Sequence, residues 1–145
     1  MPMAFLMGWI MDALFSAPAQ PKPDGIFFNN LRFSEPILFR WASPLAWSGL
    51  YAVLVFDPAC SPRPYRVIYF GQGGDLSSRV TTAHEKYSAW YAAAGGHANL
   101  YVAFHWLPTS TESQRVSAES ALVREYKPQC NVVFNPLASL FFGGR

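Results

Sequence analysis

Glu119 stands on the apolar side of a helix that the sequence predicts over residues 110–126. Three apolar side chains recur at helical spacing in the same row, Val116, Val123 and Tyr126. A carboxylate in such a row is costly unless a cation or hydrogen bonds compensate its charge. Two interpretations follow. One is an ion pair with Arg115, one turn earlier. The other is a single-carboxylate site for Mg²⁺, which keeps most of its waters and takes one or two protein carboxylates.

Arg79 lies one turn into another predicted helix, over residues 75–94, directly after the glycine-rich segment GQGGD. The dipole at a helix N-terminus favours anions rather than cations. The placement therefore predicts a phosphate held jointly by the guanidinium and by backbone N–H groups, and the alternative is a surface arginine without a role. The segment is not a dinucleotide fingerprint, because Leu76 replaces the third glycine, and it lacks the GK[ST] of a P-loop.

Two tyrosines are placed to meet beside Arg79. Tyr51 opens one predicted strand within Gly49-Leu50-Tyr51, and Tyr69 ends the next within Tyr69-Phe70-Gly71. The start of one strand lies beside the end of its antiparallel neighbour, so both rings are expected at one end of the sheet. The alternative is a pair of core aromatics whose hydroxyls reach the surface.

Five regular elements would position these groups. Apolar, β-branched runs predict strands over residues 50–56, 65–71 and 99–107, the first two forming a hairpin with a long loop. The helices over 75–94 and 110–126 follow the second and third strands. The apolar face expected on the first helix consists of Leu76, Val80, Ala83, Tyr87 and Trp90. This order predicts an α+β fold.

Residues 1–48 are predicted to form an arm that folds against this domain. Apolar residues at three- and four-residue spacing predict an amphipathic helix within residues 1–20. A secretory signal is not expected there, because no Lys or Arg precedes the apolar run and Asp12 interrupts it. After a proline-rich linker, residues 26–33 and 36–41 predict one edge strand each.

Composition and charge exclude several classes of protein. Of 145 residues, 51% are hydrophobic and 14% charged, which excludes a disordered chain. The apolar residues suffice for a core that needs no stabilising disulfide or metal ion. The net charge of +2 is too small to imply nucleic acid by itself. Cys60 and Cys130 predict separate thiols in a reducing compartment, hence a cytoplasmic protein. No apolar run reaches the roughly 18 residues of a membrane span, so no stable membrane insertion is expected.

Five elements then occur in order with informative spacing. They are Gly49-Leu50-Tyr51, Tyr69-Phe70-Gly71, Arg79 ten residues after the second tyrosine, Glu119, and Asn131 twelve residues after Glu119 and shortly after Pro128. Together they resemble the GIY-YIG endonuclease domain over residues 49–132, with residues 133–145 as an apolar tail. The resemblance implies a small three-stranded antiparallel sheet flanked by helices.

The resemblance also implies roles. Members cleave phosphodiesters with one divalent metal, so Glu119 would bind Mg²⁺ or Mn²⁺. Arg79 would neutralise charge on the phosphoryl oxygens. Tyr51 or Tyr69 would accept or orient the proton of the attacking water, with its pKa of about 10 lowered by Arg79 and the metal. Asn131 would anchor the chain beside the metal, which makes these residues the expected catalytic set.

Two positions depart from the family pattern. Members often have Tyr or His four residues after the arginine, where this chain has Ala83, and some have Lys after the YIG motif, where it has Gln72. His84 is the candidate to replace the missing Tyr or His in catalysis. It would then give the pH–rate profile of cleavage an acidic limb near pH 6.5. The alternative is a surface histidine on a solvated helix face. Substrate contacts are expected at Gly71, Gln72 and Arg79.

The sequence thus predicts a metal-dependent endonuclease that binds the phosphate backbone of DNA. A homodimer formed through the N-terminal arm would be one way to cut both strands. One alternative is a catalytically weak or inactive GIY-YIG module used in binding or assembly. Another is a secreted effector or toxin nuclease with the same chemistry and a different biological setting.

Overall fold

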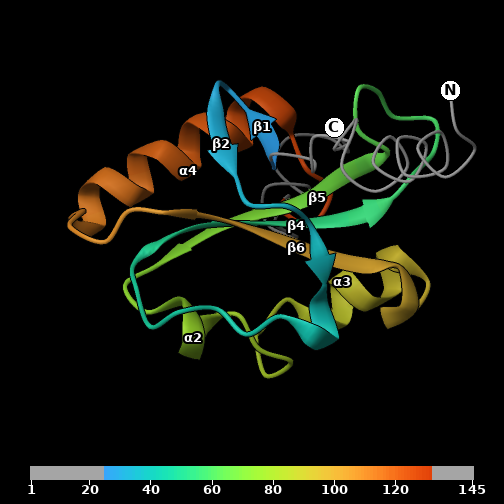
Figure 1. Cartoon of the computed structure of the whole chain (residues 1–145), viewed down its shortest axis with the longest axis horizontal. Coiled ribbons are helices and arrows are strands. Elements are labelled where there is room, and N and C mark those ends of the chain that lie inside the picture. Colours follow the sequence, from blue (N-terminus) through green and yellow to red (C-terminus); the bar gives the residue numbers. More distant parts are fainter. Residues whose placement is uncertain (1–24, 132–145) are drawn as a thin grey trace, which may run out of the picture.

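The computed structural model of the chain describes residues 25–131, and Figure 1 shows their arrangement. The helix predicted within residues 1–20 and the tail at 133–145 lie outside these described residues. The strands are β1 (Ile26–Phe28), β2 (Leu31–Phe33), β3 (Ile37–Leu38), β4 (Gly49–Phe56), β5 (Tyr65–Gly73) and β6 (Leu100–Trp106). The helices are α2 (Leu76–Arg79), α3 (Tyr87–Ala94) and α4 (Glu112–Tyr126), with 3₁₀ turns at Phe39–Trp41 and His97–Asn99. The predicted α+β class is confirmed.

The main sheet has four strands instead of the predicted three. Its order is β3-β6-β4-β5, and all neighbouring strands are antiparallel. The additional strand is β3, in which Ile37 pairs with Val102 of β6. It lies within residues 36–41, where the sequence predicts an edge strand, but it is only two residues long because Phe39–Trp41 form a 3₁₀ turn.

Residues 26–33 form a hairpin instead of a single edge strand. Strands β1 and β2 pair around Asn29 and Asn30, whose φ angles are 49° and 65°. Two consecutive residues with positive φ are the requirement of a two-residue hairpin turn of type I′, and asparagine tolerates this conformation. The hairpin therefore follows from the Asn-Asn pair that interrupts the apolar run.

Each face of the sheet is covered by a different layer, as Figure 1 shows. Tyr51 and Val53 of β4 point to the face covered by α2 and α3, where they pack with Trp90. Leu50 and Ala52 point to the face covered by the β1–β2 hairpin and α4. Strand β4 is buried on both faces, which explains why its sequence is continuously apolar.

The helix predicted over residues 75–94 is broken into α2 and α3. Asp75, the first residue of the predicted helix, caps α2, its Oδ1 accepting the Ser77 backbone N–H over 3.0 Å. After Arg79 the Thr81 side chain accepts the Ala83 backbone N–H over 3.2 Å, a local bond that competes with continuation of the helix. As a result Ala83 is exposed, and His84 is buried in its place.

Helix α4 begins with a capping box between Thr111 and Gln114. Its buried side differs from the predicted row: Arg115 and Leu122 are buried, while Val116 is 42% exposed. The apolar residues of this helix are few, so their spacing did not define a unique face. Glu119 is half-buried next to the covered side, and α4 packs alongside the edge strand β5.

Candidate active site

Tyr51 and Tyr69 meet on the face of the sheet that α2 and α3 cover. Their ring centroids are 6.0 Å apart. Tyr51 lies opposite Gly71 in the β4–β5 register, and a Cβ atom at Gly71 would overlap with the Tyr51 ring. Gly71 therefore provides the space for the tyrosine, so the structure assigns it a packing role at the predicted site.

His84 lies against Tyr51 in the interior of the protein. It is 6% exposed, and its Nε2 is 2.7 Å from Tyr51 Oη. The Lys86 backbone N–H donates to Nδ1 over 2.9 Å, so a neutral imidazole carries its proton on Nε2 and donates it to Tyr51. The Trp90 ring packs on the imidazole with centroids 4.3 Å apart. The alternative of a solvated surface histidine is wrong.

The pKa of His84 lies well below its ordinary value. Burial and the positive charge of Arg79 lower it to about 4. His84 is therefore neutral at physiological pH. Any acidic limb that it produces in the pH–rate profile falls near pH 4 instead of near pH 6.5.

Burial raises the pKa of both tyrosines above the ordinary value of a phenol. For Tyr51 the neighbouring Tyr69 adds to this increase, and Arg79 opposes it. For Tyr69 the negative charge of Glu119 adds to the effect of burial, whereas Arg79 and a hydrogen-bonding interaction with Tyr51 lower the pKa. Arg79 lowers both pKa values, as expected, but its effect does not outweigh burial.

Arg79 is held by Glu85, a residue that the sequence analysis did not single out. Its Nη1 and Nη2 donate to the two carboxylate oxygens of Glu85 over 3.0 and 2.8 Å. In a continuous helix two residues six positions apart would not face each other. The break after α2 brings them together, so this contact could be found only by predicting the break.

Glu119 acts electrostatically on the same cluster from α4. Burial raises its pKa, and the positive charge of Arg79 opposes that shift. Across residues 25–131 no cation lies within ion-pair distance of its carboxylate. The predicted alternative of an ion pair with Arg115 is therefore wrong, because Arg115 donates instead to Gln72 and Ser110.

Asn131 and Gln72, the last two predicted site residues, stabilise the structure around this cluster through hydrogen bonds. Asn131 Oδ1 accepts the Phe70 backbone N–H over 2.8 Å, and its Nδ2 donates to the Phe70 carbonyl over 2.9 Å. The asparagine thus binds the free edge of β5 as another strand would. Gln72 Oε1 accepts the Arg115 Nε–H over 3.1 Å, so Gln72 supports a buried cation.

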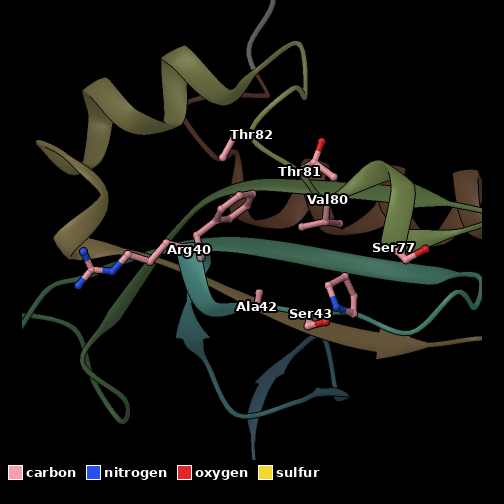
Figure 2. A pocket seen from close by; sticks show the side chains of 9 residues that line it. Arg40, Ala42, Ser43, Ser77, Val80, Thr81 and Thr82 are labelled. Atoms are coloured by element: carbon pink, nitrogen blue, oxygen red, sulfur yellow. The ribbon is translucent and has the colours of Figure 1, made fainter.

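A cavity of about 300 Å³ lies near this cluster, between the chain after Phe39 and α2. Figure 2 shows Ala42 and Ser43 on one wall and Val80 and Thr81 on the facing wall. None of the predicted site residues lines it. A second cavity, of about 650 Å³, lies beside the β1–β2 hairpin and also contains none of them.

The buried His84 gives folding stability a specific pH dependence. Between its pKa of about 4 in the folded protein and about 6.5 in the unfolded chain, the unfolded chain binds more protons. This contribution is complete above pH 6.5 and is lost as the pH falls towards 4. From pH 7 to 4.5 we expect wild type to lose roughly 2–3 kcal/mol of unfolding free energy through His84, measured by urea denaturation. The variant His84→Gln should lack this part of the loss, while the exposed His97→Gln should follow wild type.

Across the described residues no helix combines the length and apolar composition of a membrane-spanning segment. The same residues contain no cluster of three or more His, Cys, Asp or Glu side chains that could form a metal cage. Comparisons of the chain with protein-family models, with curated proteins and with solved structures found no match.

Proposed function

We propose that the protein is a metal-dependent endonuclease that hydrolyses phosphodiester bonds of DNA. The observation that carries this proposal is the single cluster formed by Tyr51, Tyr69, His84 and Arg79, on which the charge of Glu119 acts. These five side chains come from β4, β5, α2, the segment after α2, and α4. A base and a cation, with a carboxylate that acts on them electrostatically, are the groups that phosphodiester hydrolysis requires.

The donor set fits one hydrated divalent cation. Glu119 is half-buried, and its carboxylate has no ion-pair partner among residues 25–131. One carboxylate with waters and substrate phosphate is a usual environment of Mg²⁺, which does not need the multi-carboxylate cage that these residues lack. Glu119 would hold Mg²⁺ or Mn²⁺, and the bound ion would supply Lewis acidity at the oxygen that leaves phosphorus.

Tyr69 is the better placed of the two tyrosines to take the proton of water. Tyr51 is completely buried, and its oxygen already accepts the His84 Nε2–H, whereas Tyr69 is 8% exposed. As the water oxygen bonds to phosphorus and the bond to the leaving oxygen breaks, the Tyr69 phenolate accepts the water proton. Arg79 neutralises the charge on the phosphoryl oxygens. Tyr51, which accepts the His84 Nε2–H, would orient the hydroxyl of Tyr69.

One observation favours a binding module without catalysis. Both terminal nitrogens of Arg79 are engaged by Glu85, so a phosphate must displace or share that carboxylate. In a binding module this ion pair would persist, and the chain would bind its partner without turnover.

Cleavage of supercoiled plasmid by the purified protein separates the two functions. The nuclease proposal predicts nicked or linear product with Mg²⁺ or Mn²⁺ and none with EDTA. Binding of DNA without cleavage under both metals would support the non-catalytic module. The predicted homodimer through residues 1–48 is checked in the same preparation by its mass in solution.

A further inference from the structure

Arg115 is a buried cation of α4 that the proposed mechanism does not use. Its side chain is 7% exposed, and within residues 25–131 no carboxylate lies within ion-pair distance of it. Its Nη1 donates to the Ser110 carbonyl over 2.8 Å and to Ser110 Oγ over 3.1 Å, while its Nε donates to Gln72. These acceptors are all neutral. A buried charge without a counter-ion is costly, so the arrangement calls for an external anion.

The remaining nitrogen of Arg115 faces an open turn of the chain. Its Nη2 makes no hydrogen bond to the part of the chain that the structure describes. A Cβ atom at Gly74, in the turn between β5 and α2, would lie 3.6 Å from Nη2. Gly74 is exposed, so a ligand can approach the turn there. A guanidinium whose other nitrogens are fixed is oriented to bind a phosphate oxygen through the free one.

Arg79 lies on the other side of the same strand end. A Cβ atom at Gly73, the last residue of β5, would lie 3.3 Å from Arg79 Cγ. Because consecutive residues of a strand point to opposite faces, the two arginines flank the end of β5 from opposite sides. The nearest acidic residue of the turn, Asp75, is engaged with Ser77 at the start of α2. A phosphodiester chain that passes around the end of β5 would therefore meet one cation on each side of it.

We propose that Arg115 binds a second backbone phosphate of the nucleic acid, on the other side of the end of β5 from the phosphate held by Arg79. The proposal rests on the nuclease function for the identity of the anion. Gln72 and Ser110 are then positioning residues that orient the guanidinium, and Gln72 acts on substrate through Arg115. The site is specific for the backbone and carries no information on base sequence.

The test is binding of a fluorescein-labelled DNA duplex in EDTA, measured by anisotropy from 50 to 200 mM salt. Arg115→Met removes the charge and retains the volume, which often leaves a buried site stable. We expect its affinity to fall about five- to tenfold at 0.1 M salt and its salt slope to decrease by about 0.9, the loss of one phosphate contact. The matched control is Arg124→Met, which removes an exposed charge of the same helix and should change the slope less.

Gln72→Met provides a second arm that leaves Arg115 in place. It should weaken binding in the wild-type background and have no further effect in Arg115→Met, since Gln72 acts through that guanidinium. Equal affinities and salt slopes for wild type and both single variants would overturn the proposal, and so would failure of wild type to bind the duplex. Metal-dependent plasmid cleavage by wild type together with unchanged slopes would overturn this site alone and leave the nuclease function standing.

Discussion

Replacing Arg79 with alanine is expected to lower the rate of DNA cleavage by roughly 10²–10³-fold, the usual effect of removing one donor that stabilises transition-state charge. The guanidinium lies at the tyrosine cluster and influences the pKa values of Tyr51, Tyr69 and His84. The loss should appear in the single-turnover rate at saturating DNA. Affinity should fall only modestly, because one phosphate contact among several contributes little to total binding.

Arg63 provides a matched control for this substitution. Like Arg79 it forms a two-nitrogen ion pair with one glutamate, Glu35, but it lies away from the cluster. Arg63→Ala removes the same charge and the same kind of ion pair, and it should leave the single-turnover rate within about twofold of wild type. Equal losses in the two variants would show that Arg79 is a general surface charge and not part of the reaction.

Replacing Tyr69 with phenylalanine should reduce cleavage by at least about 10²-fold, the lower range for a general base. The substitution keeps the ring that packs 6.0 Å from Tyr51 and removes only the hydroxyl. Tyr51→Phe should cost less, because Tyr51 acts by holding Tyr69. The control is Tyr65→Phe, which makes the same change at the opposite end of β5 and should leave the rate unchanged.

The pH dependence of the rate gives this assignment an independent check. The pKa of Tyr69 is raised by burial and by Glu119, so its phenolate is a minor species near neutrality. The wild-type rate should therefore rise about tenfold per pH unit between roughly pH 6 and 8. Tyr69→Phe should lack this rise. A wild-type profile that is flat over this range would contradict a phenolate base.

The sequence was most informative where one strong pattern dictates the structure. The continuous apolar run at residues 50–56 predicts a central strand that is buried on both faces. Antiparallel pairing with the next strand then brings Tyr51 towards Tyr69. Asp75 was recognisable as a helix start because few other side chains satisfy free backbone N–H groups. The placement of the tyrosine pair thus follows from local chemistry.

The features that the sequence did not predict are those in which tertiary contacts outweigh weak local preferences. Apolar spacing continues across residues 80–86, so the helix break caused by Thr81 was not predictable, and with it the contacts of His84 and Glu85 were missed. On α4 the sparse apolar residues favoured Val116, whereas the tertiary contacts to Gln72 and Ser110 bury Arg115. Long-range partners decided these positions.

The most direct test of the central claim compares Glu119→Gln with Glu112→Gln in Mg²⁺-dependent cleavage of supercoiled plasmid. Both variants remove one carboxylate from α4, but Glu112 is exposed in its first turn, whereas Glu119 is half-buried near Tyr69 and Arg79. Glu119→Gln should be inactive and should melt no lower than wild type, since its carboxylate has no ion-pair partner among residues 25–131. Glu112→Gln should cleave at the wild-type rate. Cleavage by Glu119→Gln as fast as wild type in Mg²⁺ would contradict the proposed metal site and the reaction built on it.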